Sequence, residues 1–213
     1  MKMEIIEAIK KVKKGKKRNF TQAIDLIIAL SNFDIKSGNK LEEFFSLPVK
    51  TGPKKICAFV GLELKSQAQK ICDKVIAEPE FSKWSSKKDC KKLARDYDYF
   101  IAQANIMPAV AKTFGKYLGV VGKMPNPKAG QIIPPNAKLD IIVPKMKNLT
   151  KIKVSKNPVI NCKIGNENTP DQDLIKNAEY VIDHLIQKLP QGKSNIKKVL
   201  IRTTMGKPEV VKL

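Results

Sequence analysis

The sequence is short of the residues on which most enzyme and metal chemistry depends. It has one histidine, His184, and four widely spaced cysteines with no Cys-x-x-Cys pair. A structural zinc site needs closely spaced Cys and His ligands, and Ser-His or Cys-His catalysis needs an imidazole beside the nucleophile. We therefore expect no metal, no cofactor and no enzymatic activity. We interpret the cysteines as reduced, mostly buried thiols of a cytoplasmic protein.

Acidic residues, aromatic residues and long apolar runs are also scarce. Against 20 Asp and Glu stand 41 Lys and Arg, which gives a formal net charge of +21. This excess favours a polyanionic partner, with nucleic acid first and an anionic membrane surface second. No stretch approaches the roughly 18 apolar residues of a membrane span, so we expect no membrane partner. With aromatic residues at 6%, recognition of folded RNA by shape, ribose and phosphate is favoured over base stacking.

Two interruptions of the hydrophobic pattern divide the chain. Gly52-Pro53, in "KTGPKK", is the first, and "VPKMKNLTK" (residues 143–151) is the second. We predict one domain built from residues 1–52 and 152–213, with an inserted domain over residues 53–151. In the inserted domain, strand patterns alternate with helical ones, which is typical of a small parallel α/β sheet. The strand patterns lie at residues 56–61 and 97–103, the helical ones start near Ser66 and at Met107, and a Pro- and Gly-rich ordered loop covers residues 122–138.

The segments outside the insertion predict an α+β domain. Apolar residues at helical spacing predict a helix over residues 3–14. Period-2 alternation predicts a strand over residues 20–30, although the apolar Ile27 and Ala29 leave a helix there as the alternative. Further strands are expected at residues 41–49, 151–155, 158–165 and 197–204.

The clearest helix pattern begins at "TPDQDL". Thr169 is the expected N-cap, Pro170 the first helical residue and Gln172 the second member of a capping box. The apolar stripe of this helix consists of Leu174, Ala178, Val181, Ile182, Leu185 and Leu189.

The residues offer two readings of the segment "TTMGKP", residues 203–208. Thr203 and Thr204 carry hydroxyls that suit ribose, Met205 is a flexible apolar cover, and Gly206 permits close approach of an RNA backbone. The alternative is a plain turn between two strands. Lysine-rich runs elsewhere favour phosphate binding, and they lie at residues 10–18, 87–92, 145–153 and 193–198.

Several motifs occur together in a known order: "RNFTQAIDL", "FIAQANIMP", "GKMPNPKAG", "KIGN" and "TTMG". With them the sequence resembles the ribosomal protein L-one family, in its archaeal form. The resemblance implies a two-domain α/β fold, with a split β-α-β sandwich domain made of both chain ends and an inserted Rossmann-like α/β domain. It implies binding to the large-subunit ribosomal RNA stalk, help in releasing deacylated exit-site tRNA, and repression of the protein's own mRNA. We expect a monomer when free, located in the cytoplasm on the ribosome.

The resemblance also implies RNA-binding residues in the end-built domain. Thr204, Met205 and Gly206 match the family's Thr-Met-Gly triad, and Lys156 matches a lysine before a strand. Phe20 is expected to pack beneath the contact, and Asp25 to accept a hydrogen bond from a ribose hydroxyl or to orient a base. Arg18 and Lys198 are added because of their charge and proximity. The full set of expected RNA contacts is Arg18, Phe20, Asp25, Lys156, Lys198, Thr203, Thr204, Met205 and Gly206.

Two departures from the family pattern lie outside this set. Val120 and Val121 stand where the family carries Pro-Arg, and "VKTG" follows Leu47-Pro48. Two chain crossings between the domains predict a hinge for rigid-body motion. The alternatives are a small enzyme on the inserted domain, for which the sequence shows no assembled catalytic set, and a basic protein that binds nucleic acid without specificity.

Overall fold

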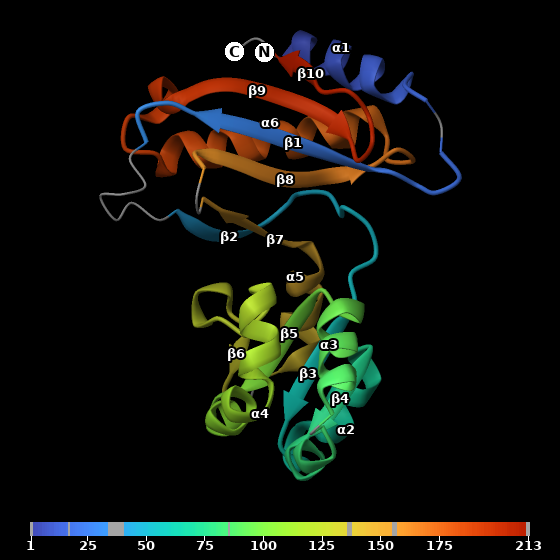
Figure 1. Cartoon of the computed structure of the whole chain (residues 1–213), viewed down its shortest axis with the longest axis vertical. Helices are drawn as coiled ribbons and strands as arrows, with labels where there is room; N and C mark the ends of the chain where they lie inside the picture. Colours follow the sequence, from blue (N-terminus) through green and yellow to red (C-terminus); the bar gives the residue numbers. More distant parts are fainter. Residues whose placement is uncertain are drawn as a thin grey trace. The chain divides into compact units, whose positions relative to one another are not determined.

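The chain folds into two compact units. The computed structural model describes residues 2–16, 18–33, 41–84, 86–135, 138–154 and 157–211. The end-built unit comprises Met1–Gly52 and Thr150–Leu213, and the inserted unit comprises Pro53–Leu149. The mixed α/β class predicted from the sequence is confirmed (Figure 1).

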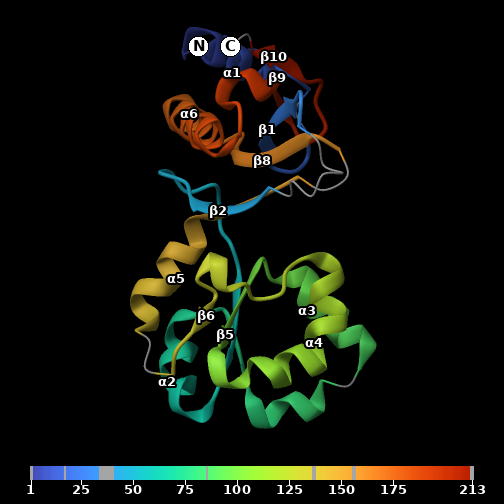
Figure 2. The same cartoon turned by 90° about the vertical axis from the view of Figure 1, so that its left-hand side faces the viewer.

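The end-built unit is a four-stranded antiparallel sheet covered by two helices. The strand order is β10-β9-β1-β8, so the first strand of the chain lies between two strands from its C-terminal part. Figure 2 shows both helices on the same side of this sheet. Helix α1 packs against β9 and β10, and α6 packs against β8. The elements are α1 (Lys2–Lys13), β1 (Ala23–Leu30), β8 (Val159–Asn166), α6 (Asp171–Lys188), β9 (Ile196–Thr203) and β10 (Glu209–Val211).

Strict alternation of side chains makes β1 a strand rather than a helix. Ile24, Leu26 and Ile28 are fully buried against the helices, together with Leu30. The intervening residues, among them Ile27 and Ala29, are half-buried on the opposite, open face of the sheet. The strand prediction is confirmed, but the strand begins at Ala23, three residues after Phe20.

Helix α6 has the predicted buried stripe but not the predicted cap. All six stripe residues are buried. The helix starts at Asp171, with Pro170 as its N-cap and no side-chain cap bond. Thr169 Oγ1 instead accepts a hydrogen bond from Asn166 N at 3.0 Å. The capping-box prediction is wrong because the Thr169 hydroxyl closes the turn before the helix, while Asp171 and Asp173 complement the helix dipole.

The inserted unit is a parallel sheet between two pairs of helices. The strand order is β4-β3-β5-β6, which confirms the parallel α/β prediction. Figure 2 shows α2 and α5 on one side of the sheet and α3 and α4 on the other. The elements are β3 (Ile56–Val60), α2 (Leu62–Ile71), β4 (Lys74–Ala77), α3 (Lys87–Asp96), β5 (Tyr99–Gln103), α4 (Met107–Val121), β6 (Ile132–Ile133) and α5 (Leu139–Asn148).

Two stretches around the inserted unit have more regular structure than the sequence predicted. The stretch 143–151 contains the division between the units, at Leu149–Thr150, but α5 runs directly into β7 (Leu149–Lys153), which pairs with β2 (Glu42–Ser46). Leu139, Val143 and Met146 form a buried stripe that holds this helix together despite Pro144. The predicted loop over 122–138 contains the short strand β6, which pairs with β5.

The cores are apolar, and the cysteine thiols are unreactive. Phe59, Phe100 and Phe114 are fully buried in the inserted unit, and the Phe59 and Phe114 ring centroids lie 4.8 Å apart. All four cysteines are free, and Cys57, Cys90 and Cys162 are buried. Burial raises the pKa of the half-buried Cys72 thiol to about 11 and that of Cys57 further, so both remain protonated near neutral pH. Among the described residues, no helix combines the length and the hydropathy of a membrane crossing.

Candidate nucleic-acid interface

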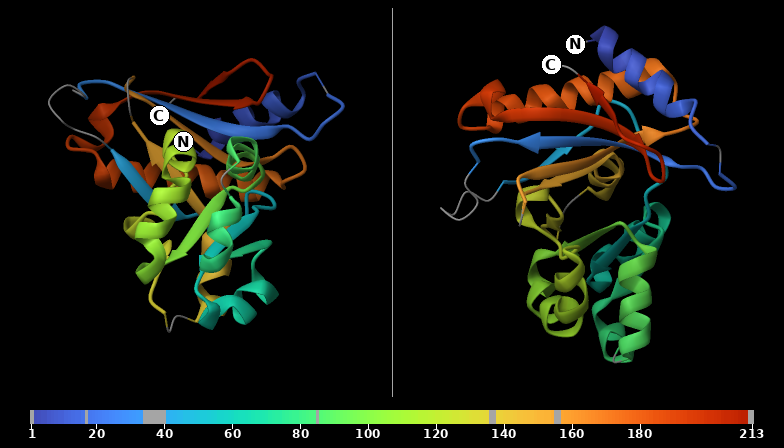
Figure 3. Two further views of the ribbon diagram at one scale, coloured as in Figure 1. Left: turned by 60° about the horizontal axis from the view of Figure 1, so that its bottom comes forward. Right: turned by 45° about the horizontal axis from the view of Figure 1, so that its top comes forward.

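One end of the end-built sheet brings together segments that are far apart in the sequence. Ile24 pairs with Thr203 in the ladder between β1 and β9. Beyond the ladder, Thr204 N donates to Ala23 O, and Ala23 N donates to Thr204 Oγ1, both at 3.0 Å. The loop before β1 and the turn between β9 and β10 therefore lie side by side (Figure 3).

Gln22 fixes these segments to each other. Its side chain is 2% exposed. Gln22 Oε1 accepts from Met205 N at 3.2 Å, and Gln22 Nε2 donates to Glu167 Oε1 at 2.7 Å. The backbone of Glu167 donates to Gln22 O at 3.1 Å. Sequence reasoning missed this residue, although its signal was present: Gln22 is a polar residue in phase with the buried positions 24, 26, 28 and 30.

Exposed side chains project from this fixed frame. Phe20 is 50% exposed and Met205 is 59% exposed, while Arg18, Thr204 and Gly206 are also at the surface. The expectation that Phe20 packs beneath the contact is wrong, because the residue precedes β1 and its ring reaches solvent. Beside it lies a polar hollow of about 660 Å³, lined by Lys13, Arg18, Asn19, Phe20, Thr21, Glu167 and Asn168.

Thr203 and Gly206 shape the turn from within. Thr203 is 4% exposed, so the expected contact of its hydroxyl with RNA is wrong. A Cβ atom on Gly206 would collide with Thr203 Oγ1, and Gly206 N donates to Thr203 O at 3.0 Å. The glycine is required by the buried threonine beneath it.

The substitution Gly206→Ala is expected to destabilise the end-built unit by about 1–3 kcal/mol, because the added methyl overpacks the turn. In the double variant with Thr203→Ala, the colliding oxygen is gone, and the penalty of the Gly206 substitution should largely disappear. Thermal unfolding of the two single variants and the double variant measures this coupling. Additive effects would show that the two residues do not compete for space.

Asp25 and two basic residues form a row across the open face of the sheet. Asp25 pairs with Lys163 of β8 and with Arg202 of β9. Burial raises the pKa of the Asp25 carboxyl, and the charges of Arg202 and Lys163 oppose that rise. Its charge is thus compensated within the sheet. Lys198 pairs with Ala29, near the other end of β1, and Lys156 lies outside the described residues.

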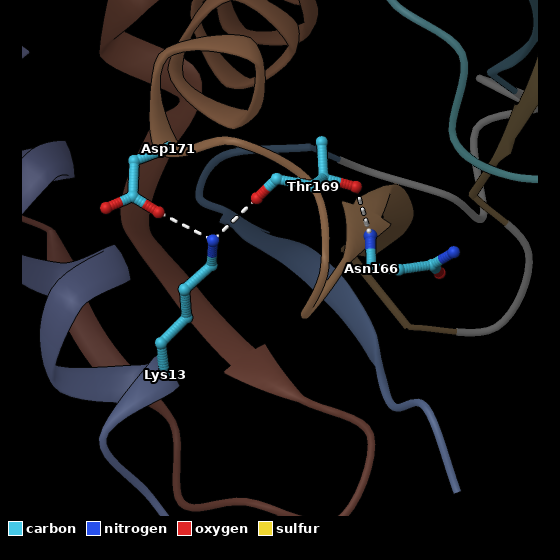
Figure 4. Close-up of polar contacts among 4 residues, drawn as sticks. All are labelled: Lys13, Asn166, Thr169 and Asp171. Atoms are coloured by element: carbon cyan, nitrogen blue, oxygen red, sulfur yellow. Dashed lines mark hydrogen bonds and ion pairs between the residues drawn. The ribbon is translucent and has the colours of Figure 1, made fainter.

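Lys13 has a structural role, because its ammonium group is paired within the unit and is not a free surface cation. Its Nζ donates to Thr169 O and to Asp171 Oδ1, both at 2.6 Å (Figure 4). This fastens the last turn of α1 to the start of α6, next to the polar hollow. One member of the lysine-rich run 10–18 is therefore half-buried and paired with a carboxylate of the same unit.

His184, the single histidine of the chain, has a structural role. His184 packs its ring 4.6 Å from that of Phe45, and burial lowers the pKa of its imidazole. Within the described part of the chain, no three His, Cys, Asp or Glu side chains lie close enough to hold a metal ion.

The chain is basic, and its exposed arginine, phenylalanine and methionine lie on a loop and a turn that hydrogen bonds hold together. These features fit the class of nucleic-acid-binding α/β proteins. The model of the Ribosomal protein L1p/L10e family matches residues 11–207. The chain is 40% identical over 209 residues to "Large ribosomal subunit protein uL1" of Nanoarchaeum equitans, covering 96% of this chain and 97% of the relative. For the proteins of the same name from Pyrococcus abyssi and Cenarchaeum symbiosum, identities are 35% (98% and 95% covered) and 33% (95% and 93% covered).

The chain therefore belongs to the Ribosomal protein L1p/L10e family, and it is of the archaeal type, as the motifs predicted. It is a ribosomal protein and, by family, a structural protein rather than an enzyme. Its predicted location on the ribosome in the cytoplasm is confirmed by the same relatives.

Proposed function

We propose that the protein is a constituent of the large ribosomal subunit and binds folded ribosomal RNA of the stalk through the exposed end of the end-built sheet. The observation that carries this proposal is the convergence of Arg18, Phe20 and Met205 over the frame held by Gln22. The names of the relatives, "Large ribosomal subunit protein uL1", support the assignment to that subunit.

The geometry suits recognition by shape. The turn with Met205 at its tip is held by Gln22 and Ala23, so little conformational entropy is lost when RNA binds. Met205 and Phe20 offer apolar cover for a sugar or a base face, and Arg18 offers a fork of donors to phosphate. Lys163, Arg202 and Lys198 on the open face extend the positive surface. Asp25, held between two of them, orients donors or accepts from a ribose hydroxyl.

The inserted unit takes the second part of the proposed role. Its 18 basic and 8 acidic residues give it a net charge of +10. The chain crosses between the units at Gly52–Pro53 and at Leu149–Thr150, and two such crossings suit a hinge. While one unit holds the stalk RNA, the other is free to contact exit-site tRNA and assist its release. A segment of the protein's own mRNA that mimics the ribosomal site competes for the same surface. Translation of that mRNA is repressed when the protein is bound to it. The free protein is a monomer.

The test is binding of the protein to its stalk RNA fragment across a salt series, with Met205→Asp and a matched control. Met3, on α1, is 76% exposed, so Met3→Asp makes the same substitution at an exposed methionine of the same unit, on the side of the sheet that the helices cover. Met205→Asp should weaken binding about 100-fold at moderate salt, because the aspartate repels phosphate and removes a short-range contact. Met3→Asp should weaken it less than about tenfold.

Equal losses for the two variants, along one steep salt dependence, would contradict this proposal. They would favour the alternative of a basic protein that binds nucleic acid without specificity.

A further inference from the structure

A groove in the inserted unit has no place in the function proposed above. It lies between α3 and α4, which pack side by side (Figure 2), and its volume is about 580 Å³. The groove belongs to the inserted unit alone, so it does not depend on the arrangement of the two units. Its floor is apolar and its rim is basic.

The floor consists of aliphatic side chains that the fold leaves in solvent. Val120 is 87% exposed and Val121 is 55% exposed. They are the last two residues of α4, and Gly122, with a φ of +70°, ends the helix directly after them. The half-buried Tyr117 continues the floor one turn earlier. Neither valine supports the core of the unit, because the buried residues of α4 are Val110, Phe114 and Leu118.

The rim carries positive charge from both helices. Lys123 Nζ donates to Ala94 O at 2.9 Å and to Tyr97 O at 2.7 Å, which caps the end of α3 and closes one end of the groove. The other rim cations form no ion pair among the described residues, and none of the residues lining the groove there is acidic. They are Lys87, Lys91, Arg95 and Lys116.

We propose that this groove binds an acidic, amphipathic α-helix of a partner protein. An apolar helix face fits a floor of valines, and glutamate or aspartate on its flanks fits a rim that carries only positive charge. Lys87 to Arg95 spans roughly 12 Å along α3, which matches about two turns of a docked helix. The site adds a protein ligand to a chain whose proposed surface for RNA lies in the other unit.

The floor distinguishes this partner from RNA. Phosphate would satisfy the rim, but a pair of exposed valines offers ribose and base edges no hydrogen bond. Surfaces that bind single-stranded RNA without sequence preference use aromatic stacking platforms, and among the residues that line this groove only Tyr117, itself half-buried, is aromatic. The aliphatic pair therefore favours a peptide over single-stranded RNA.

The probe is a fluorescent peptide of about 18 residues, long enough to form a helix, with leucines on one face and glutamates elsewhere. A scrambled peptide of the same composition keeps the charge and loses the apolar face, and a single-stranded RNA of equal charge tests the polyanion alternative. The full chain is used, as wild type and as Val120→Ser. Val210→Ser alters an exposed valine of the end-built unit, 57% exposed, and serves as the matched control.

We expect the amphipathic peptide to bind at least about tenfold more tightly than the scrambled one, and Val120→Ser to remove about that factor. Val210→Ser should leave peptide binding unchanged, and Val120→Ser should leave affinity for the stalk RNA unchanged. Circular dichroism confirms that the variants are folded. Equal binding of the two peptides, or no effect of Val120→Ser, overturns the proposal. If the RNA displaces the peptide and its own binding falls with Val120→Ser, the groove is a nucleic-acid site instead.

Discussion

Replacing Phe114 by alanine is expected to lower the free energy of unfolding of the inserted unit by about 3–5 kcal/mol. Phe114 is fully buried, and its ring contacts those of Phe59, Phe81 and Trp84, with centroids 4.8, 5.5 and 6.0 Å away. Removing it leaves a cavity in the centre of this aromatic cluster. Because domains of this size are stable by about 5–15 kcal/mol, the inserted unit would lose a large fraction of its stability.

Affinity for the stalk RNA fragment should stay unchanged in Phe114→Ala at a temperature where the end-built unit is folded. Trp84, the single tryptophan, lies in the inserted unit, so its fluorescence follows the unfolding of that unit separately. The reciprocal control is Leu26→Ala, a fully buried residue of β1. That variant should unfold the end-built unit at a lower temperature and abolish RNA binding. Loss of RNA affinity in both variants would contradict the assignment of the RNA surface to one unit.

The substitution Gln22→Leu is expected to have the second largest effect, about 3 kcal/mol of stability and about 100-fold in RNA affinity. Leucine fills a similar volume but leaves Met205 N and the Glu167 carboxylate without the partner that Gln22 provides. The neutral bond to Met205 N contributes about 0.5–1.5 kcal/mol, and the bond to the charged Glu167 carboxylate about 1.5–3 kcal/mol. The turn that presents Met205 would lose its fixed position, so affinity falls even where the unit stays folded.

Gln131→Leu is the matched control for this prediction. Gln131 is also a buried glutamine, 4% exposed, and its Oε1 accepts from Asn126 N at 2.9 Å in the inserted unit. It should destabilise the inserted unit and leave RNA affinity unchanged. Equilibrium unfolding and RNA titration of both variants compare the two units directly. Unchanged RNA affinity in Gln22→Leu would mean that the frame beneath Met205 has no part in binding.

The sequence predicted elements whose apolar residues keep one period. The alternation in β1 and the stripe in α6 are both of this kind, because each element buries one face against the other. Helix α3 was missed because only Cys90, Leu93 and Ala94 of its residues are buried among lysines. Helix α5 was not predicted, because Pro144 and the lysines interrupt its apolar pattern, although its buried stripe continues through them.

The candidate site was predicted in its composition and only partly in its geometry. Pairing of β1 with β9 brings the loop before β1 next to the turn that carries Met205, which no local pattern predicts. The same ladder places Lys198 near the other end of β1. Burial of Thr203 and the bonds of Gln22 depend on which side of the turn faces inward, and that is decided by tertiary packing.

The order of strands in the end-built sheet has a consequence for the nascent chain. β1 is among the first segments to be synthesised, but its two neighbours, β8 and β9, begin only at Val159 and Ile196. The inserted unit, Pro53–Leu149, is complete before either neighbour exists, so it can fold while both edges of β1 stay unpaired. The proposed RNA-binding surface is therefore the last part of the protein to form during translation, because the hydrogen bonds around Gln22 need Met205, which is synthesised near the end of the chain.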